Sequence, residues 1–298
     1  MDVKKVGFIG LGNMGFPMAS NLLKAGYTVY GVDVNKENEK RFVEIGGRVG
    51  FTPATLSSEV DIMLTSLPTP QIVESVYLNP DGLIPNGEAP LTLIDLSTVS
   101  PEVNKKIAQT AEENGIQYLA APVSGSVTGA EAATLSVMVG GAQDTFEFAI
   151  PYLNTIGKNI FHVGEDHGLG TIVKLINNLM AGIHTQAVAE ALSLADAAGL
   201  SHEKVYEIVN VSSGQSGVFT RNYKSFIEKN EYIKGSFTTA LLLKDLKLAN
   251  HVSESLNREL PLGKMLVDYF ESNIEGYAEK DMSSAYLMLT NKTVEAAK

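Results

Sequence analysis

The chain has 298 residues, of which 44% are hydrophobic and 19% are charged, and this composition is typical of a globular protein with a sizeable core. Its length predicts two domains rather than one. The absence of cysteine excludes disulfides and thiolate metal sites, and the net charge of −11 argues against nucleic acid as a partner.

The two stretches that come nearest to a targeting or membrane segment do not fit either class. The N-terminal "MDVKKVGFIG" has a short apolar run that is broken by glycine, unlike a secretory signal. The apolar stretch "AVAEALSLADAAGL" carries Glu190 and Asp196, which disfavour a membrane span. We therefore expect a cytoplasmic protein without membrane contact.

The first half of the chain alternates β-rich runs with segments of helical periodicity. Three of the helical segments, at 16–26, 36–47 and 101–115, end in glycine, a usual helix stop. Such alternation predicts a mainly parallel, doubly wound sheet. The predicted strands are 5–10, 28–33, 61–67, 91–97, 116–123, 135–141 and 159–163.

From about Gly170 onward the β pattern is lost and only helical periodicity remains. Residues 171–199 predict one long helix that stops near Gly199. We expect an α/β domain over 1–165, followed by an all-α domain over 166–298 that begins with this long interdomain helix. The further predicted helices are 202–210, 218–229, 238–257, 261–275 and 281–290.

The turn after the first predicted strand carries the motif G-x-G-x-x-G, which in this strand-to-helix context binds a dinucleotide. Gly10 permits the tight turn, Gly12 lets a pyrophosphate approach the backbone, and Gly15 lets the helix pack close to the sheet. Amides at the helix start then face the phosphates. We expect a Rossmann-type nucleotide site made by Gly10, Leu11, Gly12, Asn13, Met14 and Gly15.

Asp33 ends the second predicted strand, about twenty residues beyond the glycine motif. A carboxylate at this position accepts hydrogen bonds from the adenosine ribose and repels a 2′-phosphate. The sequence therefore favours NAD over NADP. Lys36 and Lys40 lie close by in the chain and keep NADP possible.

Three later stretches resemble motifs of the β-hydroxyacid dehydrogenase family, the group of 3-hydroxyisobutyrate dehydrogenase and tartronate semialdehyde reductase. They are "APVSGSVTGAEAATLSVMVGG" (121–141), "GLGTIVKLINN" (168–178) and "KDLKLA" (244–249), and the similarity extends from Lys5 to about residue 290. Two positions depart from the family pattern, since Ser126 and Ala133 stand where the family usually has glycine. These departures leave the identity of the substrate open.

The resemblance implies that Lys174 is the catalytic acid/base and that Asn178 binds and orients the substrate. The two residues are four apart on a predicted helix and so share one face. A lysine can take the hydroxyl proton in oxidation or give it back in reduction if burial lowers its pKa toward neutrality. The resemblance further implies that a carboxylate is held by Ser124, Gly125 and Ser126.

The resemblance also assigns cofactor contacts outside the glycine motif. Leu67 and Pro68, and likewise Thr98, follow predicted parallel strands, whose carboxyl ends form the edge where dinucleotides bind. Lys244 would reach the cofactor from the all-α half, and Asp245 is a candidate to hold that lysine in place.

The sequence therefore predicts an NAD-dependent 3-hydroxyacid dehydrogenase that acts on a short 3-hydroxycarboxylate or its semialdehyde. The alternatives are an NADP-dependent semialdehyde reductase of the glyoxylate or succinic semialdehyde type, and a non-catalytic NAD-binding module. The five scattered histidines predict no metal site. The expected partners are a small anionic substrate and further copies of the chain in a dimer or tetramer.

Overall fold

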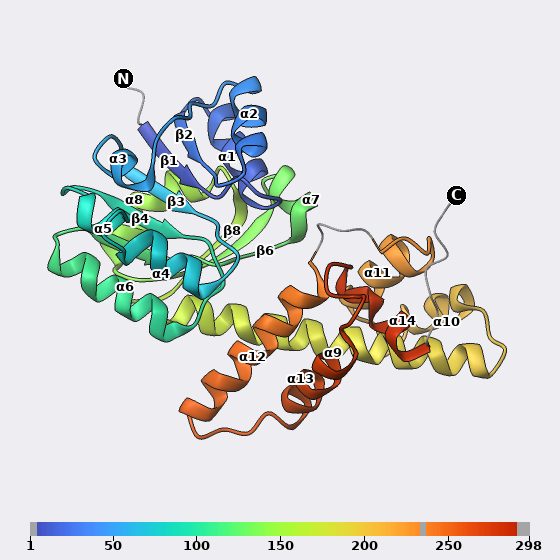
Figure 1. Cartoon of the computed structure of the whole chain (residues 1–298). Helices are drawn as coiled ribbons and strands as arrows, with labels where there is room; N and C mark the ends of the chain where they lie inside the picture. Colours follow the sequence, from blue (N-terminus) through green and yellow to red (C-terminus); the bar gives the residue numbers. More distant parts are fainter. Residues whose placement is uncertain (1–4, 233–236, 291–298) are drawn as a thin grey trace. The chain divides into compact units, whose positions relative to one another are not determined.

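The computed structural model describes residues 5–232 and 237–290. The chain divides into two compact units, Met1–Lys174 and Leu175–Lys298, shown in Figure 1. The division falls inside the longest helix, α9 (Leu169–Ala197), whereas the sequence places a boundary near residue 165.

The first unit is built on one eight-stranded sheet with the order β2-β1-β3-β4-β5-β7-β6, and β8 also pairs with β7. The neighbours among β1 to β5 are parallel, so their carboxyl ends share one edge. The strands are β1 (Lys5–Ile9), β2 (Thr28–Val32), β3 (Ile62–Thr65), β4 (Thr92–Asp95), β5 (Gln117–Ala120), β6 (Val123–Ser124), β7 (Leu135–Gly140) and β8 (Gly157–Gly164).

The predicted strand 116–123 is interrupted in the structure. It forms β5 and β6, which are separated by Ala121 and Pro122, and both pieces pair with β7 in the antiparallel direction. Pro122 has no amide hydrogen and cannot donate to a continuous ladder. The chain after Ser124 then enters the short helix α7 (Ser126–Glu131).

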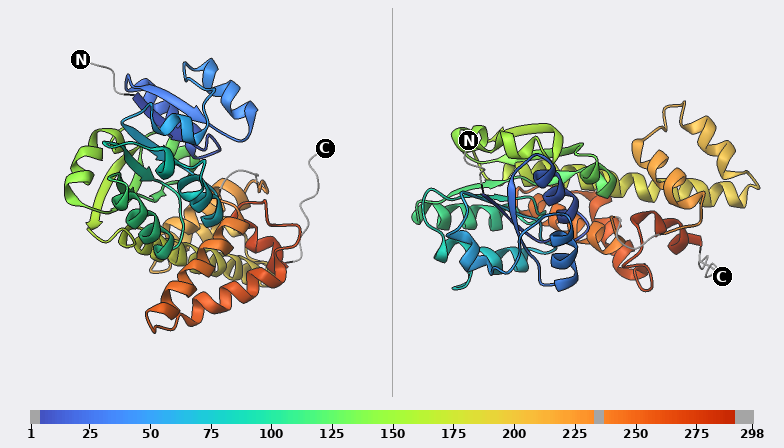
Figure 2. Two further views of the ribbon diagram at one scale, coloured as in Figure 1. Left: turned by 60° about the vertical axis from the view of Figure 1, so that its left-hand side comes forward. Right: turned by 90° about the horizontal axis from the view of Figure 1, so that it is seen from above.

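Helices cover both faces of this sheet, as Figure 2 shows. The predicted helices correspond to α1 (Gly15–Lys24), α2 (Lys36–Glu44) and α6 (Pro101–Glu113). The other helices of this unit were not predicted from the sequence; they are α3 (Pro53–Ser57), α4 (Pro70–Leu78), α5 (Leu83–Asn86), α7 and α8 (Gln143–Leu153). Several of these are short, with too few turns to show periodicity.

Alternation along the strands produces two separate cores. Val6 and Phe8 belong to one buried cluster, which includes residues of α1, α2 and α8. Ile9 and Met63 belong to the other, which includes residues of α4 and α6. Because successive side chains of a strand point to opposite faces, each cluster fills one side of the sheet.

The regular secondary structure in the described residues of the second unit is helical, apart from one isolated bridge between Thr238 and Asp281. Its elements are the rest of α9, α10 (His202–Val209), α11 (Gly217–Asn222), a π-helical turn (Tyr223–Ile227), α12 (Thr239–Ser255), α13 (Pro261–Asn273), a 3₁₀ turn (Met282–Ser284) and α14 (Ala285–Thr290). These elements lie within one residue of the helical stretches predicted from periodicity. Glycines bring the helices close, since a Cβ on Gly182 would lie 3.0 Å from Leu246.

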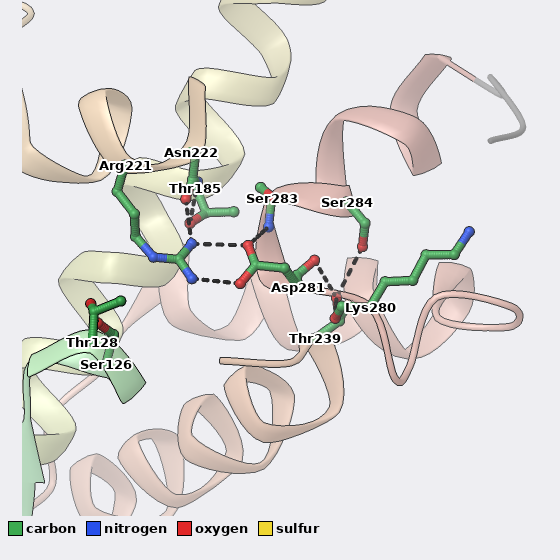
Figure 3. A network of polar contacts seen from close by, with 10 residues as sticks. All are labelled: Ser126, Thr128, Thr185, Arg221, Asn222, Thr239, Lys280, Asp281, Ser283 and Ser284. Carbon is green, nitrogen blue, oxygen red and sulfur yellow. Dashed lines mark hydrogen bonds and ion pairs between the residues drawn. The ribbon is translucent and has the colours of Figure 1, made fainter. Parts of the chain in front are cut away.

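A polar network around the buried carboxylate of Asp281 joins three of these elements (Figure 3). The Arg221 guanidinium donates to both carboxylate oxygens of Asp281, which is 0% exposed. Asp281 also accepts from the backbone N–H of Ser283 at 3.0 Å. Beside this pair, Asn222 donates to Thr185 of α9 at 3.1 Å. The polar network therefore fixes α11 against α9 and the C-terminal turn.

Candidate functional site

The glycine-rich turn has the shape that a dinucleotide site requires. Gly10 has φ +93°, and a Cβ there would lie 2.2 Å from the carbonyl oxygen of Ser66. A Cβ on Gly15 would lie 1.7 Å from the carbonyl oxygen of Gly10. Within the described part of the chain, a Cβ on Gly12 would meet no atom within 4 Å. The outer two glycines thus allow close backbone packing, and Gly12 borders open space that a phosphate can enter.

Asp33 ties this turn to the end of β2. Its carboxylate accepts from the backbone N–H of Leu11 at 2.6 Å and from that of Asn35 at 2.7 Å. Asn13 is exposed beside the turn, and Met14 is the first residue before α1. The backbone turn and the carboxylate that a dinucleotide needs therefore lie together at the carboxyl edge of the sheet, and the residues fit NAD or NADP.

The two lysines near Asp33 are both engaged with glutamates. Lys36 Nζ lies 2.9 Å from the Glu39 carboxylate, and Lys40 Nζ lies 3.2 Å from that of Glu37. Glu39 is 6% exposed and also accepts from the Asp33 backbone N–H at 3.2 Å. The positive charge close to Asp33 is thus locally compensated.

A buried carboxylate that the sequence analysis did not single out orders the next two loops of this edge. Asp95, at the end of β4, accepts from Thr65 Oγ1 at 2.8 Å and from the Ser97 N–H at 3.0 Å. Ser97 Oγ in turn accepts from the Leu67 N–H at 2.9 Å. The loop with Leu67 and exposed Pro68 and the loop with half-buried Thr98 are therefore coupled. The sequence signal that could have identified Asp95 is an acidic residue at the end of an apolar strand.

Two buried tyrosines extend the polar interior below this edge. The Tyr77 hydroxyl is 2.7 Å from Thr65 Oγ1, and the Tyr77 and Tyr118 rings meet edge to face at 5.7 Å. Burial, and after it the charge of Asp95, raises the pKa of both phenols well above the ordinary value. Both therefore stay protonated, and Tyr118 donates to Asn104 Oδ1 at 2.9 Å.

This interior reaches the first turn of α9. Asn104 Nδ2 donates to Thr171 Oγ1 at 2.6 Å, and both side chains are buried. Gly170 lies so close to β7 that a Cβ would come within 2.2 Å of the Met138 carbonyl oxygen. The start of α9 is therefore fixed to the sheet of the first unit. Lys174, 8% exposed, follows one turn after Thr171.

In the second unit, Asp245 contacts two other predicted residues, Asn178 and Lys244. Asn178, which is 2% exposed, donates through Nδ2 to Asp245 Oδ2 at 2.5 Å, and Asn177 Nδ2 donates to Asn178 Oδ1 at 3.0 Å. Lys244 Nζ lies 3.1 Å from Asp245 Oδ1. Buried Asp245 thus contacts the candidate cofactor lysine and fixes the orientation of the Asn178 amide.

The Ser124-Gly125-Ser126 segment lies at the end of β6. Gly125 has φ +141° and Ser126 has φ +66°, and the Ser126 hydroxyl is 2.8 Å from that of Thr128 (Figure 3). Ser124 is half-buried, and the next two residues are exposed. The segment therefore offers hydroxyls at the surface of the first unit.

Sequence profiles match both parts of the chain. A profile described as the NAD binding domain of 6-phosphogluconate dehydrogenase matches residues 5–164. A second, described as NAD-binding of NADP-dependent 3-hydroxyisobutyrate dehydrogenase, matches residues 168–289. The chain belongs to the β-hydroxyacid dehydrogenase family.

Members of the β-hydroxyacid dehydrogenase family resemble the chain over nearly its full length. The 2-(hydroxymethyl)glutarate dehydrogenase of Eubacterium barkeri is 42% identical over 281 residues, covering 94% of this chain and 93% of that protein. The 3-hydroxyisobutyrate dehydrogenase of Pseudomonas aeruginosa is 38% identical over 286 residues, covering 93% and 94%. The structure of Mycobacterium tuberculosis 3-hydroxyisobutyrate dehydrogenase with L-serine matches with a TM-score of 0.88 and 31% identity, covering 98% and 100%.

Residues 5–232 and 237–290 contain neither a metal-binding cluster nor a membrane-spanning helix. No group of three or more histidine, aspartate or glutamate side chains there is arranged to hold a metal ion. No helix in this part of the chain combines the length and apolar character needed to cross a membrane.

Proposed function

We propose that the chain is an NAD-dependent 3-hydroxyacid dehydrogenase that interconverts a short 3-hydroxycarboxylate and its semialdehyde. One observation carries this proposal. Lys174 is buried on α9 one turn before Asn178, and Asp245 holds the amide of Asn178. A buried lysine can exchange a proton with a reacting hydroxyl group, and an oriented amide can hold the substrate in place for that transfer.

Each residue has a definite task in this reaction. Lys174 accepts the hydroxyl proton during oxidation and returns it to the carbonyl oxygen during reduction. As an ammonium it also stabilises the negative charge that develops on that oxygen. Asn178 orients the substrate, and Ser124 with the amides of Gly125 and Ser126 binds its carboxylate. The nicotinamide, when bound, accepts or supplies the hydride.

The names attached to the relatives point to one substrate core. 2-(Hydroxymethyl)glutarate, 3-hydroxyisobutyrate and L-serine are all HO–CH₂–CH(R)–COO⁻, with R a carboxyethyl, methyl or amino group. We propose that this chain acts on the same core. The carboxylate and the hydroxymethyl group are then recognised by Ser124 and Lys174, and the pocket around R selects the acid.

We propose NAD rather than NADP as the cofactor. Asp33 offers a carboxylate to the ribose, and Lys36 and Lys40, the cations that would favour a 2′-phosphate, are paired with glutamates. This pairing weighs against the NADP-dependent semialdehyde reductase.

A panel of acids tests the proposal directly. The three acids above, with succinic semialdehyde and glyoxylate for the reverse direction, are incubated with NAD(H) or NADP(H) while nicotinamide absorbance is followed. We expect turnover of at least one HO–CH₂–CH(R)–COO⁻ acid, with a higher kcat/KM for NAD. The absence of turnover with every acid and both cofactors, by a protein that binds NAD, would favour the non-catalytic module.

We also propose that the protein is a cytoplasmic homo-oligomer, a dimer or tetramer. An exposed apolar stripe runs along α9 within the second unit, at helical spacing, and would suit an interface between copies. It consists of Ile176, Met180, Ala187, Ala191 and Leu194. The relatives include both bacterial and mitochondrial proteins, so the compartment is best tested by fractionation of the source cell.

A further inference from the structure

The first turn of α2 places a second carboxylate directly behind Asp33. Glu39 is 6% exposed, and its Oε1 accepts the backbone N–H of Asp33 at 3.2 Å. Almost all charged side chains in proteins stay at the surface unless they are paired, so this burial needs a partner. The partner is Lys36, whose Nζ lies 2.9 Å from both Glu39 oxygens.

The position of Lys36 is fixed by the same contacts. Its Nζ also donates to the Asp33 carbonyl oxygen at 3.3 Å, so the ammonium is held at the peptide that follows β2. The side chain is 70% exposed, and its charge would otherwise be available to an anion beside Asp33. Glu39 compensates that charge.

We infer that Glu39 is a specificity-determining residue that excludes NADP by holding Lys36 away from a 2′-phosphate. The inference rests on the proposed use of NAD. Cofactor preference is then set by Asp33, Lys36 and Glu39 together rather than by Asp33 alone. The Asp33 carboxylate disfavours a phosphate, and a neutral side chain at 39 would leave Lys36 as a phosphate ligand.

The same helix supplies a matched control. Glu37 forms an ion pair with Lys40 at 3.2 Å, but both side chains are well exposed, at 66% and 72%. Solvent screens such a pair, and exposed pairs have little energetic effect. Glu37→Gln makes the same change in net charge as Glu39→Gln without releasing Lys36.

The test measures kcat/KM for NAD and NADP, and separately the Kd of 5′-AMP and adenosine 2′,5′-bisphosphate, whose binding does not depend on the hydroxy acid. We expect Glu39→Gln to raise the preference for the 2′-phosphorylated ligand about tenfold, equivalent to about 1.4 kcal/mol. Glu37→Gln should change it by less than about threefold. Adding Lys36→Met to Glu39→Gln should abolish the gain.

The outcomes separate this inference from the proposed function. A wild-type protein that prefers NADP contradicts the proposed cofactor. A wild type that prefers NAD, with Glu39→Gln folded by circular dichroism and its preference unchanged, overturns the role of Glu39 alone. If Glu39→Gln does not fold, Lys36→Met in the wild-type background decides. Unchanged binding of the bisphosphate supports the sequestration of Lys36, and weaker binding overturns it.

Discussion

At the residue scale, the two residues that stand where the family usually has glycine both have a strained backbone conformation. Ser126 has φ +66° and Ala133 has φ +55°, both in the left-handed region that glycine adopts without strain. A residue with a Cβ costs about 1–2 kcal/mol there. The protein therefore tolerates strain at both ends of α7, the helix that follows the candidate carboxylate-binding segment.

Ala133→Gly should raise the free energy of unfolding by about 0.5–1 kcal/mol, because relief of strain exceeds the entropy that glycine adds to the unfolded chain. Urea unfolding measures the change. Ala132→Gly is the matched control, since Ala132 has φ −83° and glycine there should destabilise. A loss of stability in Ala133→Gly would show that the methyl group makes contacts that outweigh its strain.

Lys174 should be the residue with the largest effect on chemistry. Lys174→Ala should lower kcat by at least about 100-fold, the usual lower contribution of a general acid/base. NAD affinity, measured by titration, should stay nearly unchanged. Lys174→Arg should not restore activity, because a guanidinium keeps the charge but does not release a proton near neutral pH.

The pH profile of oxidation gives a second readout for Lys174. In the wild type the rate should rise with pH as the ammonium loses its proton, and this limb should vanish in Lys174→Ala. Substantial activity in Lys174→Arg would instead reduce the lysine to an electrostatic anchor and require another proton acceptor.

At the element scale, the loop between β8 and α9 connects the sheet to the helix that carries Lys174. His167 in this loop contacts the carbonyl oxygen of Tyr118 through Nε2 at 3.1 Å, and the two rings stack at 5.8 Å. Burial lowers the pKa of His167, and this outweighs the hydrogen bond to Tyr118 and the nearby charges of Asp166 and Glu112.

The lowered pKa predicts a loss of stability in mild acid. Above the unfolded value of about 6.5 the imidazole is neutral in both states. Below it the unfolded chain binds a proton that the folded chain resists, so stability falls as the pH approaches the folded value. Urea midpoints at about pH 7.5 and about pH 5.5 should differ less in His167→Gln than in the wild type. His251→Gln, on the surface of α12, is the control; equal losses in both variants would contradict the assignment.

Most elements could be predicted from the sequence, because hydrophobic periodicity and helix-stop residues are local signals. The long helix, the glycine turn and the five parallel strands fall at or near their predicted positions. The buried polar interior could not be predicted, since its partners are distant in the chain. Thr65 and Asp95 are 30 residues apart, and Asn104 and Thr171 are 67 apart. No periodicity pairs such residues before the sheet brings them together.

At the scale of the whole molecule, the exposed stripe of α9 predicts association. Met180, one turn from the start of this stripe, is 49% exposed. Met180→Asp should shift the mass measured by light scattering toward that of one chain, because a charge buried in an interface is costly. Ile208→Asp, at a residue 57% exposed on α10, is the control and should leave the mass unchanged. If Met180→Asp left the oligomer unaltered, the interface would lie elsewhere on the molecule.

The division inside α9 has a consequence for amide hydrogen exchange. In a continuous α-helix the N–H groups of residues 175–178 bond to the carbonyls of residues 171–174, so these bonds cross from one unit to the other. Amides before the division lose their hydrogen bonds and exchange with solvent when the first unit opens. Amides well beyond it exchange when the second unit opens. The four that cross lose their hydrogen bonds in either event, so their protection is limited by whichever unit opens more readily, and Asn178, whose N–H bonds to the Lys174 carbonyl, shares that limit.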